Sequence, residues 1–389
     1  MATIMIIAGE SSGELYGSLL AKALKAQSPD LHIIGIGVER MKEAGVEMIS
    51  SISDAFGLVE AISSYKKIRI SFNNAVEALK KFRPDVLIPI DYPDFNMKVA
   101  QVAKTLGIKI LYYVSPQVWA WRRGRVKKIA KLVDRMAVLL PFEEKIYRDS
   151  GLPCEFVGHP ILEEIEDYLA TKDRAGWKAA LGFDTGKPLL ALLPGSRPHE
   201  LNKLLPLMVD VVRQLKEDPE ISAAEDYQFC MPLAPNTEEQ KYRNFLDLLE
   251  HEGVVIRKGE SVKVLAASDM AVVASGTATL QTVFLEVPMV VVYKLSPLTY
   301  HLGKRIVKVK HITLANILSG REVVLELIQE KANAGEVLKE IKRIVFDKSY
   351  RDEMVRSYRK IKEPFTGKKA SERVAEMVME MAGRQPVIK

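Results

Sequence analysis

The sequence predicts an α/β protein with two doubly wound, Rossmann-like domains that face each other across a cleft. Three observations support this fold class. The chain has 389 residues, more than one hydrophobic core usually holds. Short apolar runs alternate with segments of helical spacing, a pattern typical of parallel sheets covered on both faces. This alternation occurs in two sets, separated by a polar stretch over residues 163–173.

In the first set, near-continuous apolar runs predict strands, and apolar residues at helical spacing predict the helices between them. The predicted strands are 4–8, 32–36, 86–90, 110–114, 136–140 and 155–157, and the predicted helices include 15–26, 70–81 and 98–106.

In the second set the predicted strands are 189–193, 228–232, 254–256, 271–274 and 289–292. After Ile317 the pattern is almost all helical. We therefore expect an N-terminal domain over 1–165, a C-terminal domain over 166–350, and C-terminal helices over 351–389 that pack on the N-terminal domain or on a partner subunit.

Composition restricts the class of protein. A hydrophobic content of 48% indicates a soluble globular chain, and no apolar run is long enough to span a bilayer. Residues 2–8 lack the features of a signal peptide, and Cys154 and Cys230 lie far apart in the sequence, so a reducing cytosol is expected. The net charge of +6 permits phosphate-bearing partners without indicating nucleic acid. The scattered histidines form no metal-binding pair.

The loops that follow the strands are the candidate sites, because open parallel sheets bind ligands at the carboxyl ends of their strands. The first loop, AGESSGELYG over 8–17, has glycines that suit close helix packing. It also has Glu10 directly after the strand, which favours a loop facing the cleft.

The second loop contains Asp91, in LIPIDYPDFN over 87–96. Aspartate is a common turn residue, so Asp91 could simply shape the bend. Near Tyr92 and Phe95 its carboxyl group would also be partly desolvated, which raises the pKa toward the range of a general base. Both interpretations stay open on spacing alone.

Three further loops carry groups suited to phosphate or lipid. YVSPQVWAWRRGRVKKIAKL, over 113–132, places two tryptophans before a basic segment, as at a lipid–water boundary. LLPGSRPHE, over 192–200, offers backbone amides and Arg197 at a loop-to-helix junction. ASGTA, over 274–278, can place Ser275 or Thr277 as a helix cap and leaves Gly276 open to a ligand. Each loop alone could also be structural.

Taken together, these loops resemble those of the lipid-A-disaccharide synthase family, which are glycosyltransferases with two Rossmann domains (the GT-B fold). The resemblance runs nearly end to end. It rests on VSPQVWAW, LLPGSR and ASGTA in this order, and it includes AGESSGELYG near the start and LANILSGREVV after residue 313.

The resemblance implies a reaction in lipopolysaccharide biosynthesis of a Gram-negative bacterium. UDP-2,3-diacylglucosamine is joined to 2,3-diacylglucosamine 1-phosphate (lipid X), which forms lipid A disaccharide 1-phosphate and UDP. Such enzymes invert the anomeric centre, use no metal and no cofactor, and work at the cytoplasmic face of the inner membrane. The implied partners are the two lipid substrates and the anionic membrane surface, with a homodimer also allowed.

The resemblance also implies roles for individual residues. Asp91 is then the base for the acceptor 6-hydroxyl, Arg197 stabilises the leaving UDP, and Glu10 is a further catalytic candidate. The implied donor site comprises Ser196, Ser275, Gly276, Thr277, Ala278, Gln281, Asn316 and Arg321. His159, in VGHP, is a rival base, but its place at the domain joint favours a structural role.

One departure from the family concerns Gln281, which stands where a glutamate is usual. A carboxylate would accept two hydrogen bonds from ribose hydroxyls, and an amide would hold the ribose less firmly.

A basic, apolar docking face for the membrane is predicted on the N-terminal domain. Segment 56–72 combines apolar residues with three basic ones, although the apolar residues also suit a core. The predicted docking residues are Lys66, Lys67, Arg69, Trp119, Trp121, Arg122 and Arg123.

Two other functions stay open on the sequence. The same scaffold serves enzymes of the UDP-N-acetylglucosamine 2-epimerase type, which need several carboxylates and a histidine at the sugar. A non-catalytic nucleotide- or lipid-binding module is the other alternative, and Gln281 is the hint for it.

Overall fold

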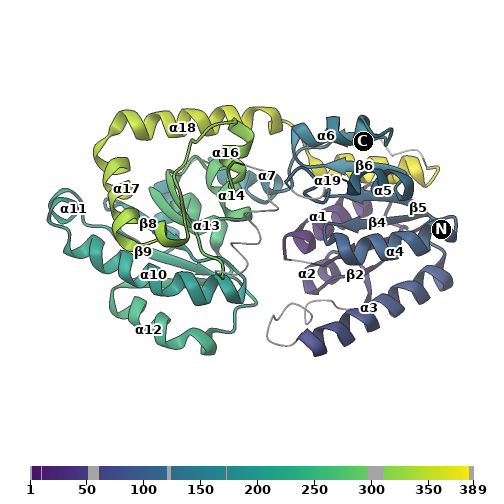
Figure 1. The fold of residues 1–389 in the computed structure, drawn as a ribbon, viewed down its shortest axis with the longest axis horizontal. Coiled ribbons are helices and arrows are strands. Elements are labelled where there is room, and N and C mark those ends of the chain that lie inside the picture. Colours follow the sequence, from purple (N-terminus) through teal and green to yellow (C-terminus); the bar gives the residue numbers. More distant parts are fainter. Residues whose placement is uncertain are drawn as a thin grey trace. The chain divides into compact units, whose positions relative to one another are not determined.

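The computed structural model divides the chain into two compact units (Figure 1). Unit 1 comprises Met1–Glu163 and Phe365–Lys389, and unit 2 comprises Glu164–Pro364. The chain therefore crosses between units twice, at 163/164 and 364/365. The boundaries expected from the sequence were 165/166 and 350/351. The structure describes residues 2–9, 11–50, 61–120, 124–171, 173–296 and 310–384, with only the backbone of 11 and 61–67.

In its described part, unit 1 has a seven-stranded parallel sheet in the order β3-β2-β1-β4-β5-β6-β7. Strands β1 and β4 are neighbours although they are distant in sequence, so the strand order reverses between them. The strands are β1 (Thr3–Ala8), β2 (His32–Ile36), β3 (Glu47–Ser50), β4 (Val86–Ile90), β5 (Lys109–Tyr113), β6 (Arg135–Val138) and β7 (Cys154–Phe156).

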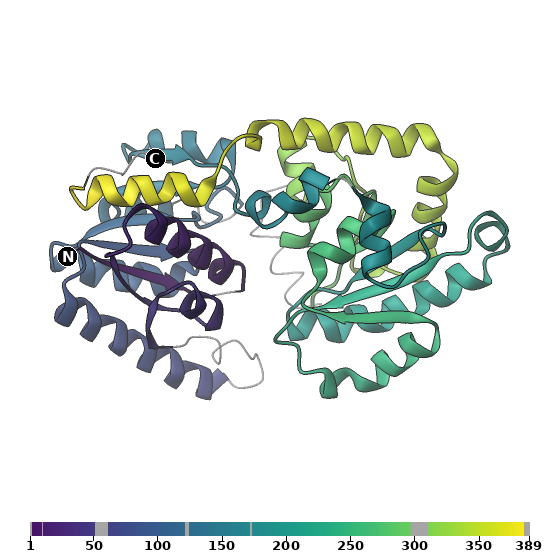
Figure 2. The ribbon, with the colours of Figure 1, turned by 180° about the vertical axis from the view of Figure 1, so that it is seen from behind.

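Alternate residues of these strands face opposite sides of the sheet, and each side has its own core. Ile4 and Ile6 pack with helices α1 and α19, whereas Met5 and Ile7 pack with α3, α4 and α5. Figure 2 shows α19 lying along α1, so the end of the chain completes the unit in which the chain begins. The helices are α1 (Ser11–Gln27), α2 (Glu39–Glu43), α3 (Ala61–Phe82), α4 (Pro93–Thr105), α5 (Arg125–Leu132), α6 (Pro141–Arg148), α7 (Ile161–Glu164) and α19 (Ala370–Met381).

Unit 2 has a six-stranded parallel sheet in its described part, in the order β10-β9-β8-β11-β12-β13, which reverses between β8 and β11. Its strands are β8 (Leu189–Leu193), β9 (Gln228–Leu233), β10 (Val254–Lys258), β11 (Met270–Ala274), β12 (Met289–Tyr293) and β13 (Glu326–Ile328). Its helices are α8 (Glu166–Thr171), α9 (Arg174–Ala180), α10 (Pro198–Glu217), α11 (Pro219–Ala224), α12 (Arg243–His251), α13 (Ser261–Ala267), α14 (Thr277–Phe284), α16 (Leu314–Ser319), α17 (Ala334–Phe346) and α18 (Lys348–Lys362).

Two strands differ from the sequence prediction. Strand β3 was not expected, and β13 interrupts the region after Ile317 for which an almost wholly helical pattern was predicted, so that prediction is wrong there. Both are short strands at sheet edges and are only partly buried. An edge strand needs no continuous apolar run, and the periodicity therefore does not reveal it. None of the described helices is both long and apolar enough to cross a membrane.

Candidate functional site

The two reversals of strand order bring the sequence motifs into neighbouring loops within each unit. In unit 1, Ile7 pairs with Pro89 and Ala8 with Ile90, so the loops after β1 and β4 lie side by side. In unit 2, Leu193 pairs with Val273, so LLPGSR and ASGTA are also neighbours. A reversal point is where doubly wound sheets open a crevice for ligands.

The turn after β4 holds Asp91 in a strained backbone conformation. Asp91 and Tyr92 have φ angles of 48° and 43°, in the left-handed region that residues with a side chain rarely adopt. The Asn96 side-chain amide donates to the carbonyl oxygens of Ile90 and Asp91, at 3.1 and 2.7 Å. The Tyr112 hydroxyl donates to the Asp91 carbonyl at 2.7 Å. These bonds fix the backbone of Asp91 at the carboxyl end of the sheet.

The Tyr112 hydroxyl remains a hydrogen-bond donor at any physiological pH. Burial raises the pKa of Tyr112 well above its ordinary value, and the nearby charge of Asp91 raises it further.

The loop after β1 contacts the Asp91 turn through Gly9. A Cβ atom at Gly9 would lie 2.6 Å from Cδ1 of Tyr92, so only glycine lets the Tyr92 ring lie against this backbone. Gly17 packs closely on Met41 and Ile90, which agrees with the helix-packing interpretation of the glycine repeat. Glu10 lies outside the described residues, and its catalytic role stays a prediction.

The predicted docking residue Trp119 is instead a core residue of unit 1. It is 9% exposed, its ring packs edge-on against Phe142, and its Nε1 donates to Glu143 at 3.1 Å. A buried indole does not reach a lipid surface, so the docking role predicted for Trp119 is not supported. Trp121, Arg122 and Arg123 lie outside the described residues, as do the side chains of Lys66 and Lys67. Arg69 is exposed on α3.

In the loop after β8, the amides of Ser196 and Arg197 are already paired. Both donate to Oε2 of the buried Glu200, at 3.0 and 3.1 Å, and Glu200 thereby caps α10. Gly195 has a φ of 94°, and a Cβ there would collide with the Glu200 carboxylate. The loop therefore offers an anion a guanidinium rather than backbone amides. The Arg197 side chain is 57% exposed, with Nη1 3.8 Å from Glu200 Oε1.

The loop after β11 leaves the start of α14 open. Gly276 is the N-cap residue, and no described side chain caps the helix. The predicted cap by Ser275 or Thr277 is wrong, because Ser275 Oγ is directed to the carbonyl oxygen of Ile312 at 3.5 Å. Gly276 and Thr277 are exposed, and Ala278 follows in the first turn. The first amides of a helix have no intrahelical acceptor and carry partial positive charge, so this start suits an anion.

Asn316 supports the backbone segment beside Ser275. It is fully buried, its Nδ2 donates to Glu326 at 2.8 Å, and its Oδ1 accepts two backbone N–H groups at 2.7 and 3.0 Å. Glu326 in turn accepts from the amides of Ile312 and Thr313 at 3.0 and 2.9 Å. Asn316 therefore shapes this edge through the backbone, and the uridine contact implied for it stays a prediction.

The side chain of Gln281 is hydrogen-bonded to the carboxylate of Glu164. It is buried on α14, and its Nε2 donates to Glu164 Oε2 at 2.8 Å. A glutamate at position 281 would place two carboxylates side by side, which is unfavourable. The departure from the family's usual glutamate therefore fits its neighbour in this chain.

Arg321, which follows the end of α16, contacts helix α18 of unit 2. Its Nη2 donates to Glu353 at 2.8 Å and to Ser357 at 2.7 Å, both on α18. A nucleotide contact by Arg321 stays a prediction.

His159 is structural, as its place in the sequence indicated. Its Nδ1 accepts from the amide of Ile161 at 3.2 Å, and burial lowers its pKa to about 3. The imidazole is therefore neutral near pH 7 and enclosed in unit 1.

Comparison with known proteins identifies the family. A family model described as Lipid-A-disaccharide synthetase matches residues 4–379. The lipid-A-disaccharide synthase of Geobacter sulfurreducens is 42% identical over 98% of this chain and 98% of its own length. The chain belongs to the lipid-A-disaccharide synthase family. The resemblance read from VSPQVWAW, LLPGSR and ASGTA is thereby confirmed, and lipid-A-disaccharide synthases are glycosyltransferases.

Solved structures confirm the fold of this lipid-A-disaccharide synthase family member. UDP-GlcNAc 2-epimerase from Neisseria meningitidis, bound to UDP-GlcNAc, has a TM-score of 0.66 at 10% identity, covering 97% of this chain and 100% of its own. A glycosyltransferase from Rickettsia africae has a TM-score of 0.59 at 12% identity, covering 98% of both chains. At such low identity these matches show the fold alone, which is the GT-B arrangement of two parallel-sheet units.

Three supporting residues of this family member were not found from its sequence: Asn96, Glu143 and Glu200. Their roles depend on partners brought together by folding. Glu200 alone left a signal, because an acidic residue in the first turn of a predicted helix often caps it.

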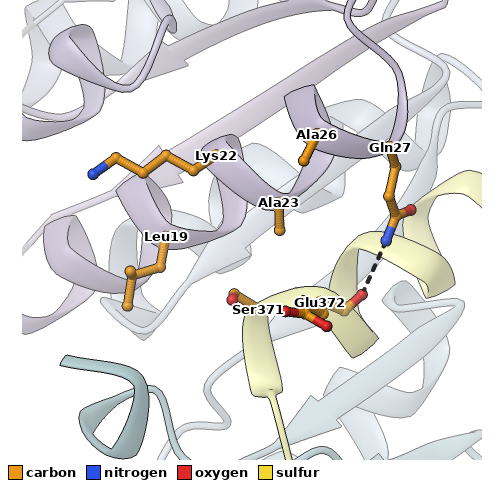
Figure 3. A pocket seen from close by; sticks show the side chains of 7 residues that line it. All are labelled: Leu19, Lys22, Ala23, Ala26, Gln27, Ser371 and Glu372. Carbon is orange, nitrogen blue, oxygen red and sulfur yellow. Dashed lines mark hydrogen bonds between the residues drawn. The ribbon is translucent and has the colours of Figure 1, made fainter. Parts of the chain in front are cut away.

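A pocket of about 410 Å³ lies between α1 and α19 (Figure 3). Gln27 Nε2 donates across it to the Glu372 carbonyl at 3.4 Å. Its lining mixes small, apolar and charged side chains at a helix–helix contact, and we assign no ligand to it. Among the described residues, no group of three or more His, Cys, Asp or Glu side chains could hold a metal ion.

Proposed function

We propose that this chain joins UDP-2,3-diacylglucosamine to 2,3-diacylglucosamine 1-phosphate by an inverting, metal-independent reaction. The products are β-1,6-linked lipid A disaccharide 1-phosphate and UDP. Besides membership of the family, the proposal rests on the place in unit 2 where the strand order reverses, between β8 and β11. There the loops after the neighbouring strands β8 and β11 hold the exposed guanidinium of Arg197 and an open helix start at Gly276–Ala278, two features that suit a diphosphate.

Each motif residue then has a defined task. The first amides of α14 bind the donor diphosphate, and Arg197 neutralises the charge that grows on UDP as the bond from the sugar C1 to the phosphate oxygen breaks. The acceptor 6-hydroxyl forms the new bond to C1 and passes its proton to Asp91. Asn96 and Tyr112 fix the backbone from which Asp91 acts.

The test is UDP release by the purified full chain with donor alone and with donor plus acceptor. The expected result is UDP release that depends on the acceptor, with one disaccharide formed per UDP. Conversion of UDP-N-acetylglucosamine to its C2 epimer without acceptor would indicate 2-epimerase chemistry. Neither UDP release nor epimer under any condition would indicate a binding module, and either result would overturn the proposal.

We also propose that unit 1 docks on an anionic membrane surface through the side covered by α3, α4 and α5. These helices pack on one face of the sheet, and Ile70 on α3 is 50% exposed. Basic side chains beside an anionic surface and an apolar residue that enters it favour such docking. Exposed basic residues on the described parts of these helices are Arg69, Lys80, Lys81, Lys98, Lys104, Lys127, Lys128 and Lys131.

Replacing Lys66, Lys67 and Arg69 with glutamate should weaken binding to phosphatidylglycerol-containing vesicles by about 100-fold or more, at about 1 kcal/mol for each basic residue lost. Vesicle sedimentation measures the effect. The matched control makes the same charge change on α17 and α18 of unit 2, at Lys339, Lys348 and Lys360, which are exposed. Equal partitioning of the two variants would contradict the docking face.

A further inference from the structure

Glu143 is a buried carboxyl group that the proposed reaction does not use. It lies on α6, directly after β6, and is 3% exposed. A carboxyl group so enclosed is costly unless both of its oxygens are hydrogen-bonded. Its partners therefore indicate why it is there.

The two oxygens of Glu143 accept hydrogen bonds from two separate segments. Oε1 accepts from Ser115 Oγ at 2.9 Å and from Trp119 Nε1 at 3.1 Å, both in the loop after β5. Oε2 accepts from the amide of Leu140, the residue before α6, at 3.1 Å. One side chain thus joins the β5 loop to the start of α6.

The β5 loop begins beside the Asp91 turn. Ile90 pairs with Tyr113 across β4 and β5, and the Asp91 amide donates to the Tyr113 carbonyl at 3.2 Å. Val114, the next residue, has a φ of 66°, an unfavourable value for a β-branched side chain. The path of the loop away from Asp91 is therefore imposed by its surroundings rather than by local preference.

We infer that Glu143 is a positioning residue, which fixes segment 115–119 beside the Asp91 turn. The role of this segment in acceptor binding rests on the proposed function. The hydrogen-bond assembly of Glu143 with Ser115, Trp119 and Leu140 does not.

This assembly can take up one proton without losing its N–H bonds. The N–H groups of Trp119 and Leu140 can only donate, and a carboxylic acid still offers each of them a lone pair. The Ser115 hydroxyl can reverse, because its oxygen also lies 3.0 Å from the Pro116 carbonyl, to which it can donate while accepting from Glu143.

Glu143 is expected to take up this proton near neutral pH. Burial raises the pKa of Glu143 to about 7, against the lowering effect of its hydrogen bonds, the largest from Ser115. Burial also raises the pKa values of the facing Tyr147 and of Cys154, the latter to about 12, so both stay neutral. The charge of Glu144 also raises the pKa of Cys154. Glu144 itself forms an ion pair with Arg148 at 2.9 Å.

The Trp119 indole N–H reports this proton directly by NMR of the ¹⁵N-labelled full chain. The chain has three tryptophans, and Trp119→Phe assigns the resonance. A carboxylate is a stronger acceptor than a carboxylic acid, so the indole proton should move downfield as pH rises, with a midpoint near 7. A resonance that stays constant from about pH 5.5 to about 8.5, on either side of this midpoint, would overturn the inference.

Three variants sharpen this test. Ser115→Ala removes a donor to the anion, so the midpoint should move to higher pH. Glu143→Gln should abolish the titration, and it does not imitate the acid, because an amide cannot accept from both Trp119 and Leu140. Glu144→Gln is the matched control and should keep the wild-type midpoint. A titration that persists in Glu143→Gln would assign the proton to another group and overturn the inference.

Kinetics separate the positioning role from the proposed function. Glu143→Gln should lower kcat/KM for the acceptor by about 10–100-fold, as expected for a displaced positioning segment. The KM of the donor, whose site is proposed in unit 2, should not change. If wild type forms no disaccharide, the proposed function fails, and the indole titration alone judges the assembly. If wild type is active and Glu143→Gln equals it toward the acceptor, the positioning role is wrong.

Discussion

Replacing Asp91 with asparagine should lower kcat for disaccharide formation by about 10²–10⁴-fold, because an amide cannot take the proton of the attacking hydroxyl. The turn itself should survive. Asn96 and Tyr112 bind the backbone carbonyl of residue 91 rather than its side chain, and asparagine tolerates positive φ well. The loss should therefore appear in UDP release at saturating substrates, with an unchanged melting temperature.

Asp94→Asn is the control for Asp91. Asp94 lies three residues after Asp91, in the first turn of α4, is exposed, and pairs with Arg125 at 2.6 Å. Its amide variant should retain kcat close to wild type. Full activity of Asp91→Asn under the same conditions would remove Asp91 as the base.

Replacing Arg197 with alanine should lower kcat by about 10²–10³-fold, the usual effect of removing one group that stabilises developing charge. The loop conformation should persist, because Glu200 binds the backbone amides of Ser196 and Arg197, and these remain in the variant. The melting temperature should consequently change little. UDP release over a range of donor concentrations separates the effects on kcat and KM.

Arg213→Ala is the matched control. Arg213 lies on α10, the helix that follows Arg197, and pairs with Glu252 at 2.9 Å. It should leave kcat unchanged. Equal kcat values for Arg197→Ala and wild type would contradict the assignment of Arg197 to the leaving group.

The sequence predicted the structure best where a run of residues fits only one kind of surroundings, such as a fully buried strand. Fully apolar runs such as 271–274 form central strands because no other element buries every side chain. Each long apolar run therefore placed a strand, and the polar residue after it marked a strand end. Asp91, Arg197 and the ASGTA loop were located in this way.

The remaining errors have a common cause, which is pairing between residues distant in sequence. Trp119 resembled a lipid-facing residue because Trp121 and basic residues surround it in the sequence, but its N–H donates to Glu143 on α6. The amides of LLPGSR resembled an anion site, but those of Ser196 and Arg197 donate to Glu200. The sequence shows which hydrogen-bonding groups are present near a strand end. Only the folded structure shows which of them already have a partner within the protein.

The double crossing of the chain has a consequence for biosynthesis. The core of unit 1 includes Val374, Ala375, Met377 and Val378 of α19, which follow unit 2 in the chain. All of unit 2 is translated before them. The N-terminal half must therefore wait, with one side of its sheet incompletely covered, while the middle of the protein can already fold. During synthesis, the unit that begins first is therefore completed after the second one.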